Sequence, residues 1–141
     1  MQVKYPQAAL RHMKDAAILE ERSRPHNAGQ LYGIAAECGL KALLVAKGSP
    51  TTPTGDLKER EDRKHLPDLK ALMSTITVFS DGRQASQYLA MMPDLNNFDD
   101  WKIDHRYWID AQVPVASLGA WKIAANQVAA MVEQANIDGI L

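Results

Sequence analysis

The sequence predicts an all-α protein, most economically an antiparallel bundle of four or five helices. Apolar residues recur every three or four positions in several segments, which is the spacing of a helix that buries one face. Prolines and glycines separate these segments at positions where helices commonly begin and end. No segment shows the alternating pattern of a strand. The nearest candidate, residues 113–115, contains a proline that argues against pairing in a sheet.

Length and composition indicate one globular domain. The chain has 141 residues, of which 46% are hydrophobic and 23% charged, close to the average for globular proteins. We therefore expect a single helical domain over residues 1–141. The formal net charge of −1 provides no overall basic field. Nucleic acid would need a local basic cluster, such as the lysines and arginines between residues 58 and 64.

Features of the sequence also bear on where the protein works. The N-terminal residues lack the apolar core of a signal peptide, and no apolar run is long enough to cross a membrane. The single cysteine, Cys38, lies within an apolar run and is interpreted as a small buried side chain rather than a nucleophile. We therefore expect a cytoplasmic protein that does not bind membranes.

Proline and glycine positions predict the first two helices. Pro6 fits the first turn of a helix that should end near Arg24, because Pro25 disfavours helical geometry in the residue before it. The second helix is expected from His26 to Lys47, with Gly48 as its left-handed terminator. Apolar residues lie on most sides of this second helix, so it is predicted to be the central helix of the fold.

The middle of the chain is predicted to contain a loop and two further helices. Residues 49–64 combine turn formers with a dense run of mixed charge, which is typical of a mobile surface loop. A fourth, short helix is expected from Arg83 to Met92, stopped by Pro93. A third helix is expected to begin near His65, with these core residues at helical spacing: Leu66, Leu69, Leu72, Met73 and Ile76.

The last part of the chain is predicted to contain an irregular segment and a long helix. Residues 98–108 are rich in aromatic and charged side chains without helical periodicity. Pro114 is expected to open the final helix. The predicted core positions of this helix are Leu118, Trp121, Ala125, Val128 and Val132.

Two charged residues interrupt the apolar second helix. Glu37 and Lys41 are spaced i, i+4 with the acid first, which is the favourable order for a helical ion pair. Their neighbours are apolar, and isolated burial of a charge would be costly, so we expect both at one edge of a buried helix. They could hold the later Arg106-Tyr107 segment or line a polar crevice shared with His65. The structural role is favoured over a catalytic one.

His65 is the first candidate for acid–base chemistry. It precedes a predicted helix, and the N–H groups at a helix start favour anions such as phosphate. A neutral imidazole beside a phosphate could take the proton of a ribose 2′-hydroxyl. Arg60, five positions earlier, could stabilise the charge that develops on the phosphate. A helix cap next to a solvated charged loop explains the same residues without catalysis.

A second cluster of polar residues is Asp104-His105-Arg106, bracketed by Trp101, Tyr107 and Trp108. Such a patch could stack a base and clamp a phosphate. In the favoured alternative, the aromatic side chains cover the helices while Arg106 pairs with Glu37.

Other chemistries lack their residue patterns. The chain has no His, Cys and carboxylate set at metal-ligand spacing, no glycine-rich phosphate loop and no Gly-x-Ser-x-Gly elbow. We therefore expect neither a metal site nor a cofactor.

Three short motifs occur in an order and spacing that point to a known family. Residues 35–44, AAECGLKALL, are similar to an Ala-x-Glu-x-x-Leu-Lys-Ala-Leu helix, and Gly48 follows. Residues 65–69 are similar to a His-x-Leu-x-x-Leu motif, and residues 106–107 to a late Arg-Tyr pair. With these motifs, residues 26–108 resemble the HEPN superfamily of small helical domains.

The resemblance implies a bundle of four or five helices that dimerises. Many HEPN proteins are metal-independent endoribonucleases of toxin–antitoxin or phage-defence systems and cleave RNA through an Arg-x4-6-His motif. Others bind nucleotides or RNA, or pair with a nucleotidyltransferase. In this chain only Arg60 and His65 have that spacing, earlier than expected, since no histidine follows Arg106. The implied catalytic residues are His65, Arg60 and Arg106, and the implied binding residues are Glu37, Lys41, His105 and Tyr107.

The leading hypothesis is therefore a HEPN-like homodimer that binds RNA or nucleotide. Whether it is an enzyme is left open; if it is, it is a metal-independent endoribonuclease with a nucleotidyltransferase-like antitoxin as a further partner. The alternative is a non-catalytic helical interaction module whose apolar faces recruit a partner helix. A third hypothesis is a helical bundle whose pocket holds a small apolar ligand.

Overall fold

The structure, a computed structural model, is all-α in the part that it describes. It describes residues 1–71, 73 and 82–141, and only the backbone for 82–85. Within these ranges there is no strand, only an isolated antiparallel bridge between Thr51 and Leu57. No helix of the described residues is long and apolar enough to span a membrane. The prediction of a helical protein is confirmed.

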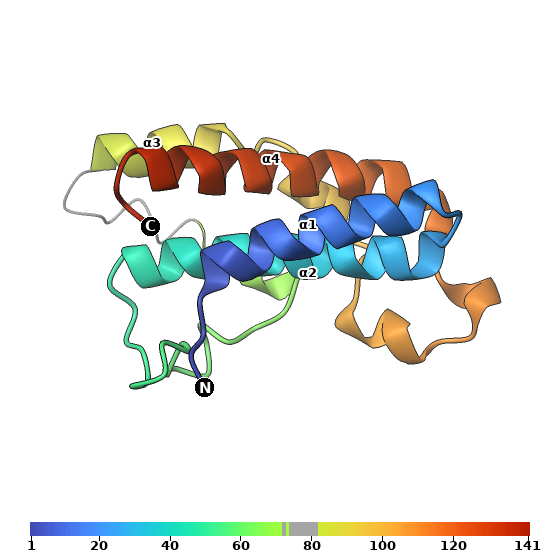
Figure 1. Cartoon of the computed structure of the whole chain (residues 1–141), viewed down its shortest axis with the longest axis horizontal. Helices are drawn as coiled ribbons and strands as arrows, with labels where there is room; N and C mark the ends of the chain where they lie inside the picture. Colours follow the sequence, from blue (N-terminus) through green and yellow to red (C-terminus); the bar gives the residue numbers. More distant parts are fainter. Residues whose placement is uncertain (72, 74–81) are drawn as a thin grey trace.

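The long helices lie alongside one another (Figure 1). They are α1 (Tyr5–Glu21), α2 (Pro25–Ala46) and α4 (Leu118–Ile137), and α2 packs against both of the others. The predicted starts of α1 and α2 are correct to within one residue. The helix α1 ends three residues before the predicted Arg24, because the chain turns at Ser23, whose φ is +57°.

The helix α2 is the central element, as predicted. Most of its side chains are buried, and Gly48, with φ +100°, follows its end in the left-handed conformation. Two glycines allow neighbours to reach its backbone. A Cβ on Gly39 would lie 2.3 Å from Val128 of α4, and one on Gly33 would lie 1.9 Å from the ring of Trp101. A larger residue at either position would collide with buried side chains.

Short helical turns replace some of the predicted helices. The predicted short fourth helix is confirmed as α3 (Gly82–Ala90), which ends before Pro93. The final helix α4 begins at Leu118 and not at Pro114, because 3-10 turns precede it. These are η4 (Asp110–Gln112) and η5 (Val115–Ser117), and the irregular segment before them contains η2 (Leu95–Phe98) and η3 (Ile103–Tyr107).

The segment around His65 differs from the predicted third helix. Its described part forms a 3-10 turn over residues 68–71. The predicted core residues Leu66, Leu69 and Met73 are buried. The other two predicted core residues, at positions 72 and 76, lie outside the described residues.

The loop of residues 49–64, predicted to be mobile, is anchored to the helices. Leu57 is fully buried within its charged sequence. Val3 donates its backbone N–H to the carbonyl of Thr54 at 2.7 Å, and the Tyr5 hydroxyl donates to Asp56. These contacts fix the course of the chain as it approaches His65.

Cys38 behaves as predicted from the sequence. Its side chain is partly buried against the core, and burial raises the pKa of the thiol to about 11. The thiol therefore stays protonated near neutral pH and is a poor nucleophile.

Candidate functional site

The predicted polar residues of α2 meet His65 in one cluster, which we call the Glu37 cluster (Glu37, Lys41 and His65). The Lys41 ammonium donates to Glu37 Oε1 at 2.7 Å. His65 Nδ1 lies 2.9 and 3.0 Å from the two carboxylate oxygens of Glu37. The sequence-based expectation that these three side chains lie together is confirmed.

Burial distinguishes the three members of the Glu37 cluster. The side chain of Glu37 is 9% exposed and that of Lys41 10%, whereas the side chain of His65 is 51% exposed. The two opposite charges are therefore held largely out of water, where removal of either one would leave the other buried without a partner and destabilise the fold. The imidazole stands at the border between these buried charges and solvent.

Local packing explains how His65 reaches α2. Leu66 and Leu69 are buried, so the chain after His65 is pressed against the core. Leu69 donates its backbone N–H to the His65 carbonyl at 2.9 Å, and Leu66 donates its own to Glu37 Oε2 at 3.4 Å. The sequence predicted that an anion would be favoured at this turn. The carboxylate of Glu37 occupies that position.

The contact with Glu37 fixes the tautomer of a neutral His65. A carboxylate only accepts hydrogen bonds, so Nδ1 must carry the hydrogen that it donates to Glu37. The other ring nitrogen, Nε2, then bears a lone pair. No hydrogen bond of the described residues involves this Nε2. An imidazole held in this way is arranged to accept a proton from a molecule on the solvent side.

Arg60 lies in the exposed turn that precedes His65. Its backbone carbonyl accepts a hydrogen bond from the N–H of Arg63 at 3.2 Å. Across the described ranges, no hydrogen bond or ion pair joins the Arg60 guanidinium to the Glu37 cluster. Arg60 is therefore close to His65 in the sequence, but its side chain does not bond to the Glu37 cluster.

Arg106 does not pair with Glu37, so that prediction is wrong. Its guanidinium is exposed on η3 and lies 4.7 Å from the ring centroid of Tyr107, which is also exposed. The carboxylate of Glu37 already has donors on its own helix and on the His65 segment. The segment η3 instead meets α2 at Gln30, two helical turns earlier.

The sequence suggested that His105 binds a substrate. In the structure its side chain is inside the protein and does not face solvent. It is 5% exposed, and its ring centroid lies 4.6 Å from that of Trp108 and 6.0 Å from that of Trp121. Burial lowers its pKa. Its Nδ1 has no hydrogen-bond partner in the described part of the chain. The spacing of polar residues could not reveal this, because η3 turns His105 inward and Arg106 outward.

Sequence analysis missed a buried polar residue beside η3. Gln30 is 8% exposed and donates its side-chain N–H to the Ile103 carbonyl at 3.0 Å, while its Oε1 lacks a partner. The signal was present in the sequence, because Gln30 lies seven residues before Glu37 and hence on the same face of α2. This face of α2 therefore carries two buried polar side chains, Gln30 and Glu37, two helical turns apart.

Metal-ligating residues do not gather in the described ranges: no group of three or more His, Cys, Asp or Glu side chains there could hold a metal ion. Comparisons with known proteins found no matching family model, curated protein or solved structure.

Proposed function

We propose that this chain is a HEPN-like antiparallel helical bundle that binds RNA and cleaves it without a metal ion, with His65 as general base. The observation that carries this proposal is the contact between His65 Nδ1 and the buried Glu37 carboxylate, at 2.9 and 3.0 Å. A half-exposed imidazole oriented by a buried acid is the arrangement that proton transfer to a solvent-facing nitrogen requires.

In the proposed reaction, His65 Nε2 takes the proton of a ribose 2′-hydroxyl. The 2′-oxygen forms a bond to phosphorus, and the bond between phosphorus and the 5′-oxygen breaks. Water protonates the leaving 5′-oxygen, and His65 afterwards returns its proton to solvent. The products are a 2′,3′-cyclic phosphate and a 5′-hydroxyl end.

The other predicted site residues take supporting roles. Arg60, in the turn before His65, stabilises the negative charge on the phosphate. It is favoured over Arg106 because Arg106 lies on η3, which meets α2 two helical turns away from Glu37. Lys41 balances the charge of the Glu37 carboxylate and keeps it in place. Glu37 and Lys41 are thus positioning residues.

The resemblance to HEPN proteins supports a biological setting for this activity. In that setting the protein is a cytoplasmic homodimer of a toxin–antitoxin or phage-defence system. A nucleotidyltransferase-like antitoxin would be its partner, and RNA its substrate. These assignments depend on the residues of the three motifs, above all on residues 35–44.

Cleavage of a fluorogenic RNA in the presence of EDTA tests the proposal. We expect wild-type protein to release a 2′,3′-cyclic phosphate, and a strand with 2′-deoxyribose at the cleaved position to stay intact. His65→Gln should lower the rate by about 100-fold or more, which is the usual contribution of a general base. His12→Gln is the matched control, because His12 lies on α1 outside the Glu37 cluster.

Unchanged thermal unfolding of His65→Gln would separate a chemical role from a structural one. Absence of cleavage by wild-type protein over a panel of RNA sequences, with EDTA or with Mg²⁺, would overturn the proposed activity. Equal rates for wild-type protein and His65→Gln would overturn the role of His65.

An interaction module is the second candidate, and one observation favours it. Tyr107 is 73% exposed, Ile109 66% and Trp108 39%, so consecutive apolar side chains face solvent. Charged residues of both signs surround them, with Lys102 5.6 Å from the Trp108 ring centroid and Arg106 4.7 Å from that of Tyr107. An exposed apolar patch with a polar rim is typical of a protein interface. If this surface joins two copies of the chain, Tyr107→Ser should shift sedimentation toward the monomer. The interaction module is favoured over the nuclease only if RNA cleavage is also absent at every protein concentration.

A further inference from the structure

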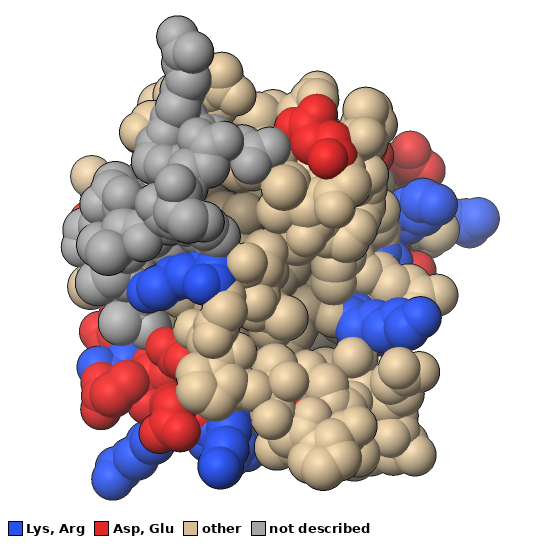
Figure 2. Space-filling model, turned by 90° about the vertical axis from the view of Figure 1, so that its left-hand side faces the viewer, with Lys and Arg blue, Asp and Glu red and all other residues tan. Residues whose placement is uncertain are grey.

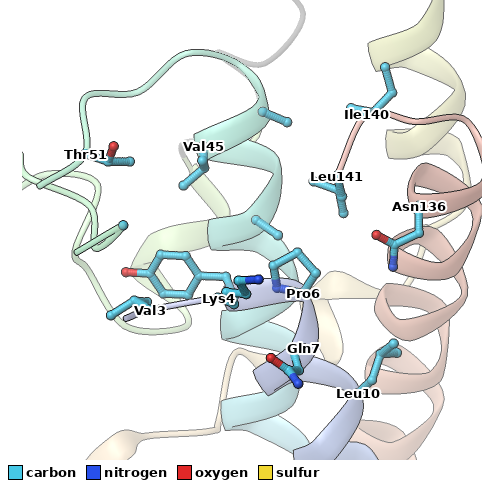
Figure 3. A pocket seen from close by; sticks show the side chains of 14 residues that line it. Val3, Lys4, Pro6, Gln7, Leu10, Val45, Thr51, Asn136, Ile140 and Leu141 are labelled. Atoms are coloured by element: carbon cyan, nitrogen blue, oxygen red, sulfur yellow. The ribbon is translucent and has the colours of Figure 1, made fainter. Parts of the chain in front are cut away.

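A cavity lies at the end of the molecule where α1 begins and α2 ends. Its volume is about 740 Å³, within the range of sites for small organic ligands. Figure 3 shows the first residues of α1 and the last turn of α2 on one side of it, and the residues that end α4 and follow it on the other. Apolar side chains supply most of the lining, among them Val3, Leu10, Val45, Ala46, Ile140 and Leu141.

Most of the charged side chains that line the cavity and the hollow beside it are basic. Lys4 is the charged side chain among the lining residues of the cavity, and no acidic side chain of the described residues lines it. A second hollow of about 350 Å³ shares Gln7 and Leu10 with the cavity and is also lined by Arg11, Lys14 and Asp15. Among the described residues, no ion pair engages Lys4, Arg11 or Lys14. Figure 2, which views this end of the molecule, shows a largely uncharged surface with basic and acidic side chains around it.

The polar groups at the cavity are few. The amides of Gln7 and Asn136 and the hydroxyl of Thr51 belong to its lining. The Tyr5 hydroxyl is already engaged with Asp56. An apolar interior with a few polar groups and one cation is the chemistry that recognises a molecule with an apolar body and a single anionic group.

We propose that this cavity binds a small amphipathic anion, with an alkyl chain among the apolar side chains and a carboxylate near Lys4. A protein segment would bring backbone N–H and C=O groups, and the apolar lining offers them few partners. A cationic amphiphile would meet Lys4, Arg11 and Lys14. The inference is independent of RNA cleavage, because the cavity residues do not belong to the Glu37 cluster.

Titration of the protein with decanoate, below its micelle concentration, tests this site by calorimetry and by chemical shifts of the lining residues. We expect saturable binding of one decanoate, weaker binding of decanol, and none of decyltrimethylammonium. Lys4→Gln should weaken decanoate binding by about two- to five-fold at low salt and leave decanol binding unchanged, as expected for an exposed charge. Lys102→Gln is the matched control, since Lys102 lies near Trp108 at the other end of α2.

A variant that fills the cavity gives a second test. Ala46 ends α2 and is only partly buried, so Ala46→Trp should fold while its indole occupies the cavity. We expect it to lose decanoate binding, whereas Ile123→Trp, at an exposed position of α4, keeps it. The proposal is overturned if wild-type protein does not bind decanoate, if Ala46→Trp binds it as well as wild type, or if decanoate and decyltrimethylammonium bind equally.

Discussion

Two buried polar regions on the same face of α2 differ in how well their atoms are paired. In the Glu37 cluster the carboxylate accepts hydrogen bonds from Lys41, His65 and the Leu66 backbone. Around η3, Gln30 Oε1 and His105 Nδ1 have no partner in the described chain. Buried polar atoms without partners cost stability, so the first region holds the fold together and the second weakens it.

The contrast between the two histidines follows from this difference. His65 has a carboxylate on one ring nitrogen and solvent near the other, whereas His105 is enclosed by Trp108 and Trp121. Proton transfer to a substrate needs both an oriented ring and access. Of these two histidines only His65 meets both requirements, which supports its proposed role as the base; the sequence analysis named His105 as a binding residue.

The largest expected effect comes from breaking the buried ion pair. Glu37→Gln leaves the Lys41 ammonium buried without a carboxylate, which should cost about 3–5 kcal/mol of unfolding free energy. Urea unfolding measures this loss, with Glu133→Gln on the exposed side of α4 as the control. A loss no larger than that of the control would mean that the cluster is solvated and that its pairing contributes little.

Replacing both charges sharpens the same comparison. In the double variant Glu37→Leu/Lys41→Met, apolar side chains of similar volume remove the need for pairing, so most of the lost stability should return. The Leu66 N–H still loses its acceptor, so the recovery is incomplete. This stable variant should cleave RNA far more slowly than wild-type protein, because the imidazole of His65 is no longer oriented by Glu37. A double variant that cleaves at the wild-type rate would contradict a positioning role for Glu37.

His105→Phe should stabilise the protein by about 1 kcal/mol at pH 7, because it removes a buried nitrogen without a partner. The pKa of His105 is lowered by burial from its ordinary value of 6.5. The unfolded chain therefore binds a proton more readily than the folded one. Stability is fully present above pH 6.5 and falls as the pH drops below it.

Thermal unfolding at pH 7.5 and pH 5.5 measures both effects of His105→Phe. The variant should lose less stability than wild type between these two pH values, with a remainder from His12, whose pKa is also lowered by burial. Equal pH dependence in the variant and in wild type would show that His105 is solvated.

The smallest effect is expected for Gln30→Met. The variant removes the unpaired Oε1 but also the hydrogen bond to the Ile103 carbonyl, and these contributions have opposite signs. The unfolding free energy should therefore change by less than about 1 kcal/mol. Urea unfolding of the variant and of wild-type protein under the same conditions measures this change. A loss comparable with that of Glu37→Gln would mean that the η3 region is as well paired as the Glu37 cluster.

The parts of the fold that could be predicted are those that local sequence determines. The starts of α1 and α2 follow from Pro6 and Pro25, and the terminator of α2 from Gly48. The 3-10 turns after residue 90 follow no apolar period. They are set by tertiary contacts, such as the Trp101 N–H bonded to the Gly29 carbonyl at 3.1 Å.

In the candidate site, too, the features set by local sequence could be predicted and those set by tertiary contacts could not. The pair Glu37 and Lys41 could be predicted from its spacing on one helix, and His65 from the turn that precedes buried leucines. The partner of Glu37 could not, because the choice between His65 and Arg106 depends on how two irregular segments pack on α2. The terminal cavity was also missed, since residues far apart in the sequence form it.

The most direct test of the central claim is the tautomer of His65, which ¹⁵N NMR of histidine-labelled protein reports at a pH where the ring is neutral. We predict that Nδ1 carries the hydrogen and Nε2 the lone pair, and that the double variant Glu37→Leu/Lys41→Met loses this preference. A spectrum in which Nε2 of His65 carries the hydrogen in wild-type protein would contradict the proposed role of Glu37 and, with it, of His65 as the base.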